Sequence, residues 1–271
     1  MPSNTLIHKP AKWAFDKGHV ASEWQDIARD LIYAVPFWEG GGEALEIVNG
    51  VQSTREDIVN VSWVGTDKGP AVKSAGGASD RINLGPLPLL EGLLAHSIVI
   101  YIERLADGIQ DRILGSNSTD YILTWWSDDK FYWDVANTSQ RATTGAISAG
   151  RYVIALINDG SASLNRKIYI DGIFQAEVTD PDTVPSGGFP YYLFDSSVNI
   201  RVFAGTIYSF MAWNRALTLP EIKKLARDPF GPFRMDEDIE WLAVAAAGGG
   251  ATPHGPLGHP LWGPLAGPVA A

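Results

Sequence analysis

Cysteine is absent from this sequence of 271 residues, which excludes disulfide bonds, thiolate metal sites and a cysteine nucleophile. The absence leaves the compartment open, because cysteine-free proteins occur everywhere. Basic residues are also scarce: 21 Lys and Arg stand against 31 Asp and Glu, giving a formal net charge of −10. No basic cluster is present that could neutralise phosphates, so we expect no nucleic-acid binding.

Long apolar runs are missing as well. Residues 1–13 lack an apolar stretch of signal-peptide length, and no later segment approaches the roughly 20 apolar residues of a membrane span. We therefore expect no membrane insertion. If the protein works outside a cell, we expect it to leave by a route other than a classical signal peptide.

Short β-type segments dominate what is present. The sequence is 45% hydrophobic with 10 Trp and 28 Gly, a composition typical of a folded chain with many turns. From about residue 31 to residue 212, short apolar or alternating runs are separated by Gly, Asp, Asn and Ser clusters. Strands follow one another without intervening helices, so we predict an all-β fold.

Two hairpins and two central strands can be located. Residues 166–178 predict a hairpin whose tight turn is the Asp-Gly pair at 171–172, and residues 121–135 predict a second hairpin with a Ser-Asp-Asp reversal. The runs 97–105 and 151–159 are almost uniformly apolar, as expected for central strands buried on both faces.

Only two segments predict helices. The first, over 22–31, opens with Ser and Gln at the spacing of a capping box. The second begins at Thr218, three residues before Glu221, and carries Pro220 in its first turn, where the missing N–H costs little. Pro229 is expected to end it.

The segment 203–229 resembles the last strand and closing helix of laminin-G-like domains of the concanavalin A type. The pattern is a strand with F-x-G-x-I, then N-R-A-L-(S/T), then E-I, a leucine and a proline. The matching residues are Phe203, Gly205, Ile207, Asn214, Arg215, Ala216, Leu217, Thr218, Glu221, Ile222, Leu225 and Pro229. Upstream, residues 31–42 look like the family's opening strand with its acidic-glycine turn, and residues 150–172 resemble its long central strand and Y-x-D-G hairpin.

The resemblance covers about residues 20–233 and implies a concanavalin A-like jelly-roll sandwich of two antiparallel sheets with a short C-terminal closing helix. We divide the chain into an N-terminal arm (1–20), the laminin-G-like domain (21–233), and an acidic connector with a Pro/Gly-rich C-terminal arm (234–271). The central strand has Arg-Tyr-Val at 151–153 where many family members carry Trp-His-His-like residues, so no site residue can be transferred through it.

The hairpin 121–135 carries a dense group of aromatic residues. Alternation directs half of the side chains inward for core packing, while the other face could stack on sugar rings. The candidate carbohydrate-binding residues are Trp125, Trp126, Tyr132 and Trp133.

We expect no cofactor, with calcium as the alternative. Asp128 and Asp129, with Asp134 or Asn137, could supply the oxygen ligands that calcium prefers. The alternative is that the two aspartates simply make the hairpin turn. The five histidines show no metal-ligand spacing.

We expect no catalytic residues. The acidic run DEDIEW at 236–241 superficially resembles the E-x-D-x-E strand of laminarinase-type glucanases, which use two carboxylates. It follows the closing helix instead of lying on a concave sheet, and it begins with Asp236 instead of Glu, so we interpret it as a solvated acidic segment.

The C-terminal segment after Trp241 contains no charged residue, and its prolines recur at a spacing of four, at 256, 260, 264 and 268. Such a segment cannot form a helix or an internal strand, and the alternatives are a disordered tail or an extended arm. Its apolar residues and fixed proline φ angles favour an arm that lies on a neighbouring subunit or partner. The candidate assembly residues are Leu257, Leu261, Trp262, Leu265 and Val269.

Taken together, the features resemble accessory proteins of tailed bacteriophage particles, in which the N-R-A-L…E-I…P closing helix is often found. The resemblance implies a non-enzymatic virion structural protein that decorates the capsid or tail, with other virion proteins or its own copies as partners, and that is exposed on the particle surface. Lectin-like adhesion to a surface glycan is the alternative, and a glycoside hydrolase is a third hypothesis.

Overall fold

The computed structural model describes residues 20–38, 40–41, 44, 46–48, 58–77, 79–87, 92, 95–107, 111–116, 121–135, 142–160, 165–179, 190–194 and 202–234. The chain divides into two compact units, 1–235 and 236–271, and every described residue belongs to the first. Asn137, the acidic run at 236–241 and both predicted arm segments other than Val20 and Arg234 lie outside the described residues.

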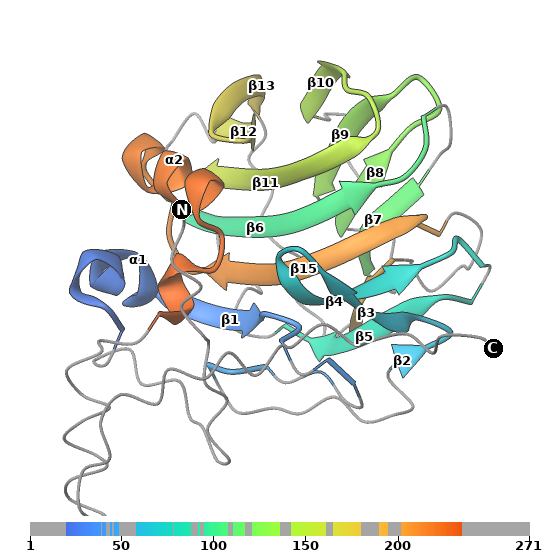
Figure 1. The fold of residues 1–271 in the computed structure, drawn as a ribbon. Coiled ribbons are helices and arrows are strands. Elements are labelled where there is room, and N and C mark those ends of the chain that lie inside the picture. Colours follow the sequence, from blue (N-terminus) through green and yellow to red (C-terminus); the bar gives the residue numbers. More distant parts are fainter. Residues whose placement is uncertain are drawn as a thin grey trace, which may run out of the picture. The chain divides into compact units, whose positions relative to one another are not determined.

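The described strands form two antiparallel sheets (Figure 1). The larger sheet has the order β13-β12-β11-β6-β15-β4-β3, and β1 also pairs with β15. Its strands are β1 (Leu31–Val35), β3 (Ser62–Thr66), β4 (Gly69–Ser74), β6 (Ala95–Arg104), β11 (Gly150–Asp159), β12 (Asn165–Ile170), β13 (Ile173–Thr179) and β15 (Gly205–Trp213).

The smaller sheet has the order β10-β9-β8-β7-β14-β5-β2. Its strands are β2 (Ile58–Val59), β5 (Arg81–Pro86), β7 (Asp111–Ser116), β8 (Tyr121–Trp125), β9 (Lys130–Val135), β10 (Ala142–Ala146) and β14 (Pro190–Leu193). The two sheets confirm the predicted all-β sandwich, which is consistent with a jelly roll.

The two predicted central strands are the middle of the larger sheet. β6 and β11 pair over their whole length, from Gly150 opposite Arg104 to Asp159 opposite Ala95, and β15 pairs with the other side of β6. All nine residues of β15 are buried, as are most of those in β6. These strands are buried on both faces, which is why their sequences lack a polar alternation.

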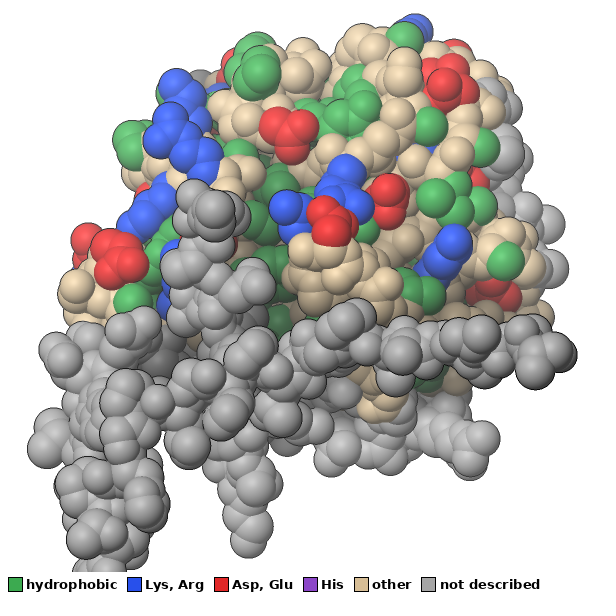
Figure 2. All heavy atoms as spheres, in the orientation of Figure 1, with side chains coloured by type: hydrophobic (Ala, Val, Ile, Leu, Met, Phe, Trp, Pro, Cys, Tyr) green, Lys and Arg blue, Asp and Glu red, His purple; other side chains and the backbone are tan. Residues whose placement is uncertain are grey.

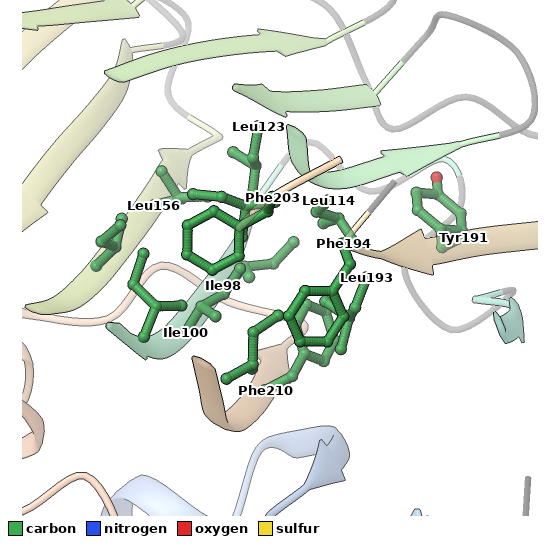
Figure 3. Packing of buried hydrophobic residues seen from close by; sticks show 14 of the residues in the cluster. Ile98, Ile100, Leu114, Leu123, Leu156, Tyr191, Leu193, Phe194, Phe203 and Phe210 are labelled. Atoms are coloured by element: carbon green, nitrogen blue, oxygen red, sulfur yellow. The ribbon is translucent and has the colours of Figure 1, made fainter. Parts of the chain in front are cut away.

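One core lies between the sheets. Figure 3 shows residues of β6, β11 and β15 facing residues of β7, β8 and β14, with Phe194 and Phe203 among them. These two rings stack with their centroids 6.0 Å apart, and both are fully buried.

A second apolar cluster lies on the opposite face of the larger sheet and is covered by helices. A 3-10 turn (Ser22–Trp24) leads into α1 (Gln25–Ala28), and α2 (Leu219–Arg227) is followed by a 3-10 turn at Gly231–Phe233. Trp213 of β15 anchors this layer, because its indole N–H donates to the carbonyl of Ile27 at 2.7 Å. Burial beneath the helices explains the absence of polar residues on this half of the face.

The closing helix begins as the sequence predicts. Thr218 is the N-cap of α2, and its capping box with Glu221 is complete, with the Glu221 carboxylate accepting from the Thr218 amide at 2.7 Å. The predicted capping box of the first helix is wrong. Ala21 is the N-cap there and makes no side-chain capping bond. The side-chain amide of Gln25 donates to the main-chain carbonyl of Val20 instead. That helix ends early because the chain enters β1 at Leu31.

Both predicted hairpins are confirmed. β12 and β13 are joined by Asp171 and Gly172, whose φ angles of 51° and 76° are the two left-handed positions of a tight turn. β8 and β9 pair directly across the second reversal, from Tyr121 opposite Val135 to Trp125 opposite Phe131.

Candidate functional site

The β8–β9 hairpin is closed by main-chain bonds that fix the direction of each side chain. The Trp126 amide donates to the Lys130 carbonyl, and the Asp129 amide donates to the Trp126 carbonyl, both at 2.9 Å. Asp129 adopts a left-handed φ of 59°, a conformation that Asp tolerates better than most residues. The predicted aspartate turn is therefore present.

Two of the four candidate sugar-binding residues point into the protein. Trp125 and Trp133 are fully buried, so neither can present a ring face to a sugar. The Trp125 indole N–H donates to the Asp129 carbonyl at 3.0 Å, and the Arg104 guanidinium lies 4.6 Å from its ring centroid. For these two residues the carbohydrate assignment is wrong, because strand alternation directs them into the core.

The other two candidates remain at the surface. Trp126 and Tyr132 are partly exposed, and their rings meet edge to face with centroids 5.6 Å apart. The Tyr132 hydroxyl donates to the Asp128 carboxylate at 2.9 Å, and the Lys130 ammonium lies 3.3 Å from the same carboxylate. We call Trp126, Asp128, Lys130 and Tyr132 the hairpin patch.

The aspartates of the turn are both engaged by protein groups. Asp129 is paired with the buried Arg104 at 2.9 Å. Desolvation acts to raise the pKa of Asp128, but hydrogen bonds from Tyr132 and Lys130 outweigh it. The pKa of Asp128 therefore lies below its usual value. Within the described part of the chain, no group of three His, Asp or Glu residues could hold a metal ion. Calcium would have to displace these partners and draw on other ligands.

A second polar cluster lies on the outer face of the larger sheet, where the β3–β4 hairpin folds over the sheet (Figure 1). Figure 2 shows charged side chains of both signs near the middle of this face. Arg151 bonds Asp67 of the hairpin turn at 2.9 Å, lies 3.7 Å from Glu103 and stands over the Tyr208 ring at 5.2 Å. We call Asp67, Glu103, Arg151 and Tyr208 the Arg151 cluster.

The polar groups of the Arg151 cluster form hydrogen bonds and ion pairs with one another. The Tyr208 hydroxyl donates to Glu103 at 2.9 Å, and burial together with Glu103 raises the pKa of Tyr208 above its usual value, so the phenol stays protonated. Its ring is fully buried and stacked on Tyr101 at 4.5 Å, leaving no exposed aromatic face. The sequence identified Arg151 only as a departure from the family pattern. Its partners come from β6, β15 and a distant turn, and no local pattern could identify them.

A two-sheet antiparallel sandwich closed by a C-terminal helix is the architecture of concanavalin A-like domains. Residues 76–223 match the family described as the concanavalin A-like lectin/glucanases superfamily, and the chain belongs to this family.

Three solved structures with the same fold share little sequence identity with this chain. Trypanosoma rangeli sialidase in complex with the inhibitor DANA aligns with a TM-score of 0.54 and 14% identity over 72% of this chain and 32% of the sialidase. Domain 4 of AbnA, an extracellular GH43 arabinanase from Geobacillus stearothermophilus in complex with arabinotriose, aligns with a TM-score of 0.56 and 13% identity over 73% of this chain and 98% of that domain. The binding domain of botulinum neurotoxin DC in complex with SialylT aligns with a TM-score of 0.56 and 13% identity over 74% of this chain and 52% of that domain's chain.

This chain thus spans about a third of the sialidase's length, and at these identities the likeness extends to the fold. A search of curated protein sequences finds no match. Among the described helices, none is long and apolar enough to cross a membrane.

Proposed function

We propose that this protein is a non-enzymatic structural protein of a tailed bacteriophage particle, attached through its terminal arms, whose sandwich binds a glycan at the hairpin patch. The observation that carries the glycan-binding part is the patch itself: two partly exposed aromatic rings beside a carboxylate and an ammonium group. Lectin-like adhesion and particle decoration are compatible roles for one domain.

The hairpin patch has the chemistry that saccharides require. An aromatic ring stacks on the apolar C–H face of a pyranose or furanose, and neighbouring charged groups bond its hydroxyls. Trp126 supplies the ring, while Asp128 and Lys130 supply an acceptor and a donor at the same edge. Because the protein carries a net charge of −10, we favour a neutral glycan over a polyanionic one.

The non-enzymatic part of the proposal is supported by the engagement of the carboxylates. Glycoside hydrolysis uses two carboxyl groups that flank a bound sugar. Asp67 and Glu103 both engage Arg151, and Asp107, Asp111 and Asp129 all surround Arg104 at 2.9–3.7 Å. The bond from Arg151 holds the pKa of Asp67 below its usual value, which makes that carboxylate a poor general acid. Asp111 differs, because its burial raises its pKa despite the neighbouring Arg104.

The particle role rests on sequence features: the N-R-A-L…E-I…P closing helix, and a charge-free C-terminal segment with regularly spaced prolines. Host lysis would release such particles without a signal peptide. Mass spectrometry of purified phage particles from a host that encodes this chain tests it. Recovery only from the unassembled fraction would contradict the proposal.

The glycan site is tested by titrating the full chain with arabinotriose and, separately, with a sialylated oligosaccharide, in calcium and in EDTA. Trp126→Ala should weaken binding about tenfold, since loss of one stacking ring costs roughly 1.4 kcal/mol. Tyr132→Phe keeps the ring and loses the bond to Asp128, so it should weaken binding less. A calcium requirement that disappears in Asp128→Ala would support a metal at the Asp128 and Asp129 turn.

Phe174→Ala is the comparison variant, because it removes an exposed aromatic side chain from another hairpin. Equal losses in the Trp126 and Phe174 variants would refute the assignment of the patch, as would an unchanged affinity in Trp126→Ala. Hydrolysis of either oligosaccharide that is lost on Asp238→Ala or Glu240→Ala would instead support the glycoside hydrolase hypothesis.

A further inference from the structure

β13 is the most exposed apolar edge among the described strands. It forms one end of the larger sheet, where it pairs with β12 and lies beside β10, the end strand of the smaller sheet. Ile173 is 65% exposed and Phe174 is 50% exposed, the two highest values among the large hydrophobic residues described. Over seven residues the strand carries one charged residue, Glu177, and no proline. Natural proteins usually protect such an edge with charges, prolines or a covering segment.

The other two edges of the same sheet, at β1 and β3, carry no strongly exposed large apolar side chain among the described residues. The free side of β1 is closed by residues 46–48: the Ile47 amide donates to the Ala34 carbonyl, and the buried Glu46 carboxylate accepts from the Ala34 amide, both at 2.9 Å. β3, at the far end, is five residues long and places no strongly exposed large apolar side chain at the surface. Among the described end strands of this sheet, β13 alone therefore carries strongly exposed large apolar side chains.

The edge is also held rigidly. Asp171 of the β12–β13 turn exchanges bonds with Val153 of β11, donating its amide at 2.9 Å and accepting through its carboxylate at 2.8 Å. Gly172 packs against α2, where an added Cβ would lie 3.2 Å from Lys223. A strand fixed at its start loses little entropy when a partner pairs with it.

The C-terminal segment has the sequence that an added edge strand needs. In an extended chain, residues of one parity direct N–H and C=O toward one side, and residues of the other parity direct them away. Within residues 256–269 the four prolines, at 256, 260, 264 and 268, all share one parity, so their missing N–H groups would all face away from a partner strand. The leucines and valine at 257, 261, 265 and 269 have the other parity and keep their N–H groups for pairing.

The composition points the same way. A residue before proline is restricted to extended conformations, which predisposes the segment to strand addition. Residues 242–271 contain no charge, which suits an apolar edge and would leave no ion unpaired there. The 21 residues between 234 and 256 span up to about 75 Å when extended, enough to reach a neighbouring molecule.

We infer that residues 256–269 of one copy add as a strand to the β13 edge of a second copy. The inference rests on the proposed role of the C-terminal arm in assembly and specifies where the arm binds. Main-chain hydrogen bonds to β13 supply affinity, and the side chains of Ile173 and Phe174 meet the aliphatic residues of the arm.

The absence of cysteine allows a direct test, because an introduced thiol is the only one in the chain. Full-length protein carrying Gln175→Cys on β13 is mixed with full-length protein carrying Gly263→Cys in the arm, and a short bis-maleimide is added. Each chain has one thiol, so a cross-link between the two proteins can form only between copies. Lys73→Cys, an exposed position on β4 of the same sheet, replaces Gln175→Cys as the matched control.

We expect the 175–263 cross-link to predominate and the 73–263 cross-link to stay at background. Light scattering should show a full-length oligomer that becomes monomeric on truncation at Val244 or on Phe174→Lys, with unchanged thermal stability because Phe174 is half exposed. Predominant 175–175 cross-links would replace the inference with direct pairing of two β13 edges. Equal yields from positions 73 and 175, or monomers throughout, would overturn it.

The two proposals fail separately. Trp126→Ala should remove glycan binding and leave the oligomer intact, whereas Phe174→Lys should do the reverse. Loss of the cross-link with retained glycan binding would refute only the docking site, and an intact cross-link without glycan binding would refute only the hairpin patch.

Discussion

Arg215 of the N-R-A-L pattern joins three parts of the fold. Its guanidinium forms two bonds to the Glu221 carboxylate, at 2.7 and 2.9 Å, and a third to Asp30 at 2.9 Å. It also donates to the Asp26 carbonyl at 3.0 Å. Because Glu221 is the N3 residue of the capping box of α2, Arg215 links the start of that helix to the end of the α1 region.

The change Arg215→Ala should lower the free energy of unfolding by about 3 kcal/mol. The bidentate pair with Glu221 is mostly buried, and we assign it about 2 kcal/mol. The bond to Asp30, whose side chain is 35% exposed, is discounted to about 1 kcal/mol. In a domain of this size, such a loss lowers Tm by roughly 6–12 °C.

Differential scanning calorimetry with urea unfolding measures this loss, and Arg215→Lys is the informative companion. A lysine keeps the charge but cannot form the two parallel bonds, so it should recover less than half of the stability. Equal stability of the Lys variant and the parent would refute the bidentate argument. So would a double-mutant cycle with Glu221→Gln that gives no coupling, since directly bonded pairs should couple by about 1 kcal/mol or more.

Two further predictions concern stability. In Gly205→Ala the new Cβ would lie 2.3 Å from the Phe203 ring and 2.4 Å from the Glu103 carbonyl. We therefore expect the free energy of unfolding, measured in urea, to fall by about 3 kcal/mol. In the control Gly65→Ala the new Cβ has no atom within 4 Å, so the free energy of unfolding should change by less than about 0.5 kcal/mol. Similar losses in both would contradict the packing argument. Burial raises the pKa of Asp111 to about 6 from 3.8, so the folded state binds its proton more tightly, and stability should fall by up to about 3 kcal/mol as pH rises from 4 to above 6. Asp111→Asn should lack this slope, and an identical pH profile for parent and variant would exclude Asp111 as its source.

The features that the sequence predicted well are governed by local chemistry. The Asp171-Gly172 turn and the Thr218 capping box each depend on residues within a few positions of one another, and both are present. The family pattern F-x-G-x-I also has a local cause. The Phe203 ring folds over position 205, where only glycine leaves room for it.

The features that the sequence could not resolve depend on distant partners. Alternation predicted that half of the aromatic residues of the β8–β9 hairpin would point inward, but it did not say which half. Arg104, from β6, determines the environment of Trp125 by lying over its ring and holding the adjacent turn through Asp129. Ser22 does not cap the first helix, because it is the first residue of the 3-10 turn and Ala21 occupies the N-cap position.

Three arginines of this acidic chain pair with carboxylates from several parts of the fold. Arg104, Arg151 and Arg215 each gather at least two carboxylates that come from different elements of the fold. A guanidinium shared in this way offsets the repulsion between acidic groups that a net charge of −10 would otherwise impose.

At the hairpin patch the only acidic group, Asp128, is paired with a flexible, exposed lysine instead of a buried arginine. An exposed lysine pair contributes little to stability, so a ligand can compete for either member at small cost. We therefore favour the hairpin patch, where two aromatic rings lie beside a weakly paired carboxylate, as the site for a neutral ligand. This contrast is the physical reason for placing recognition at Trp126 and Tyr132 and not at the Arg151 cluster.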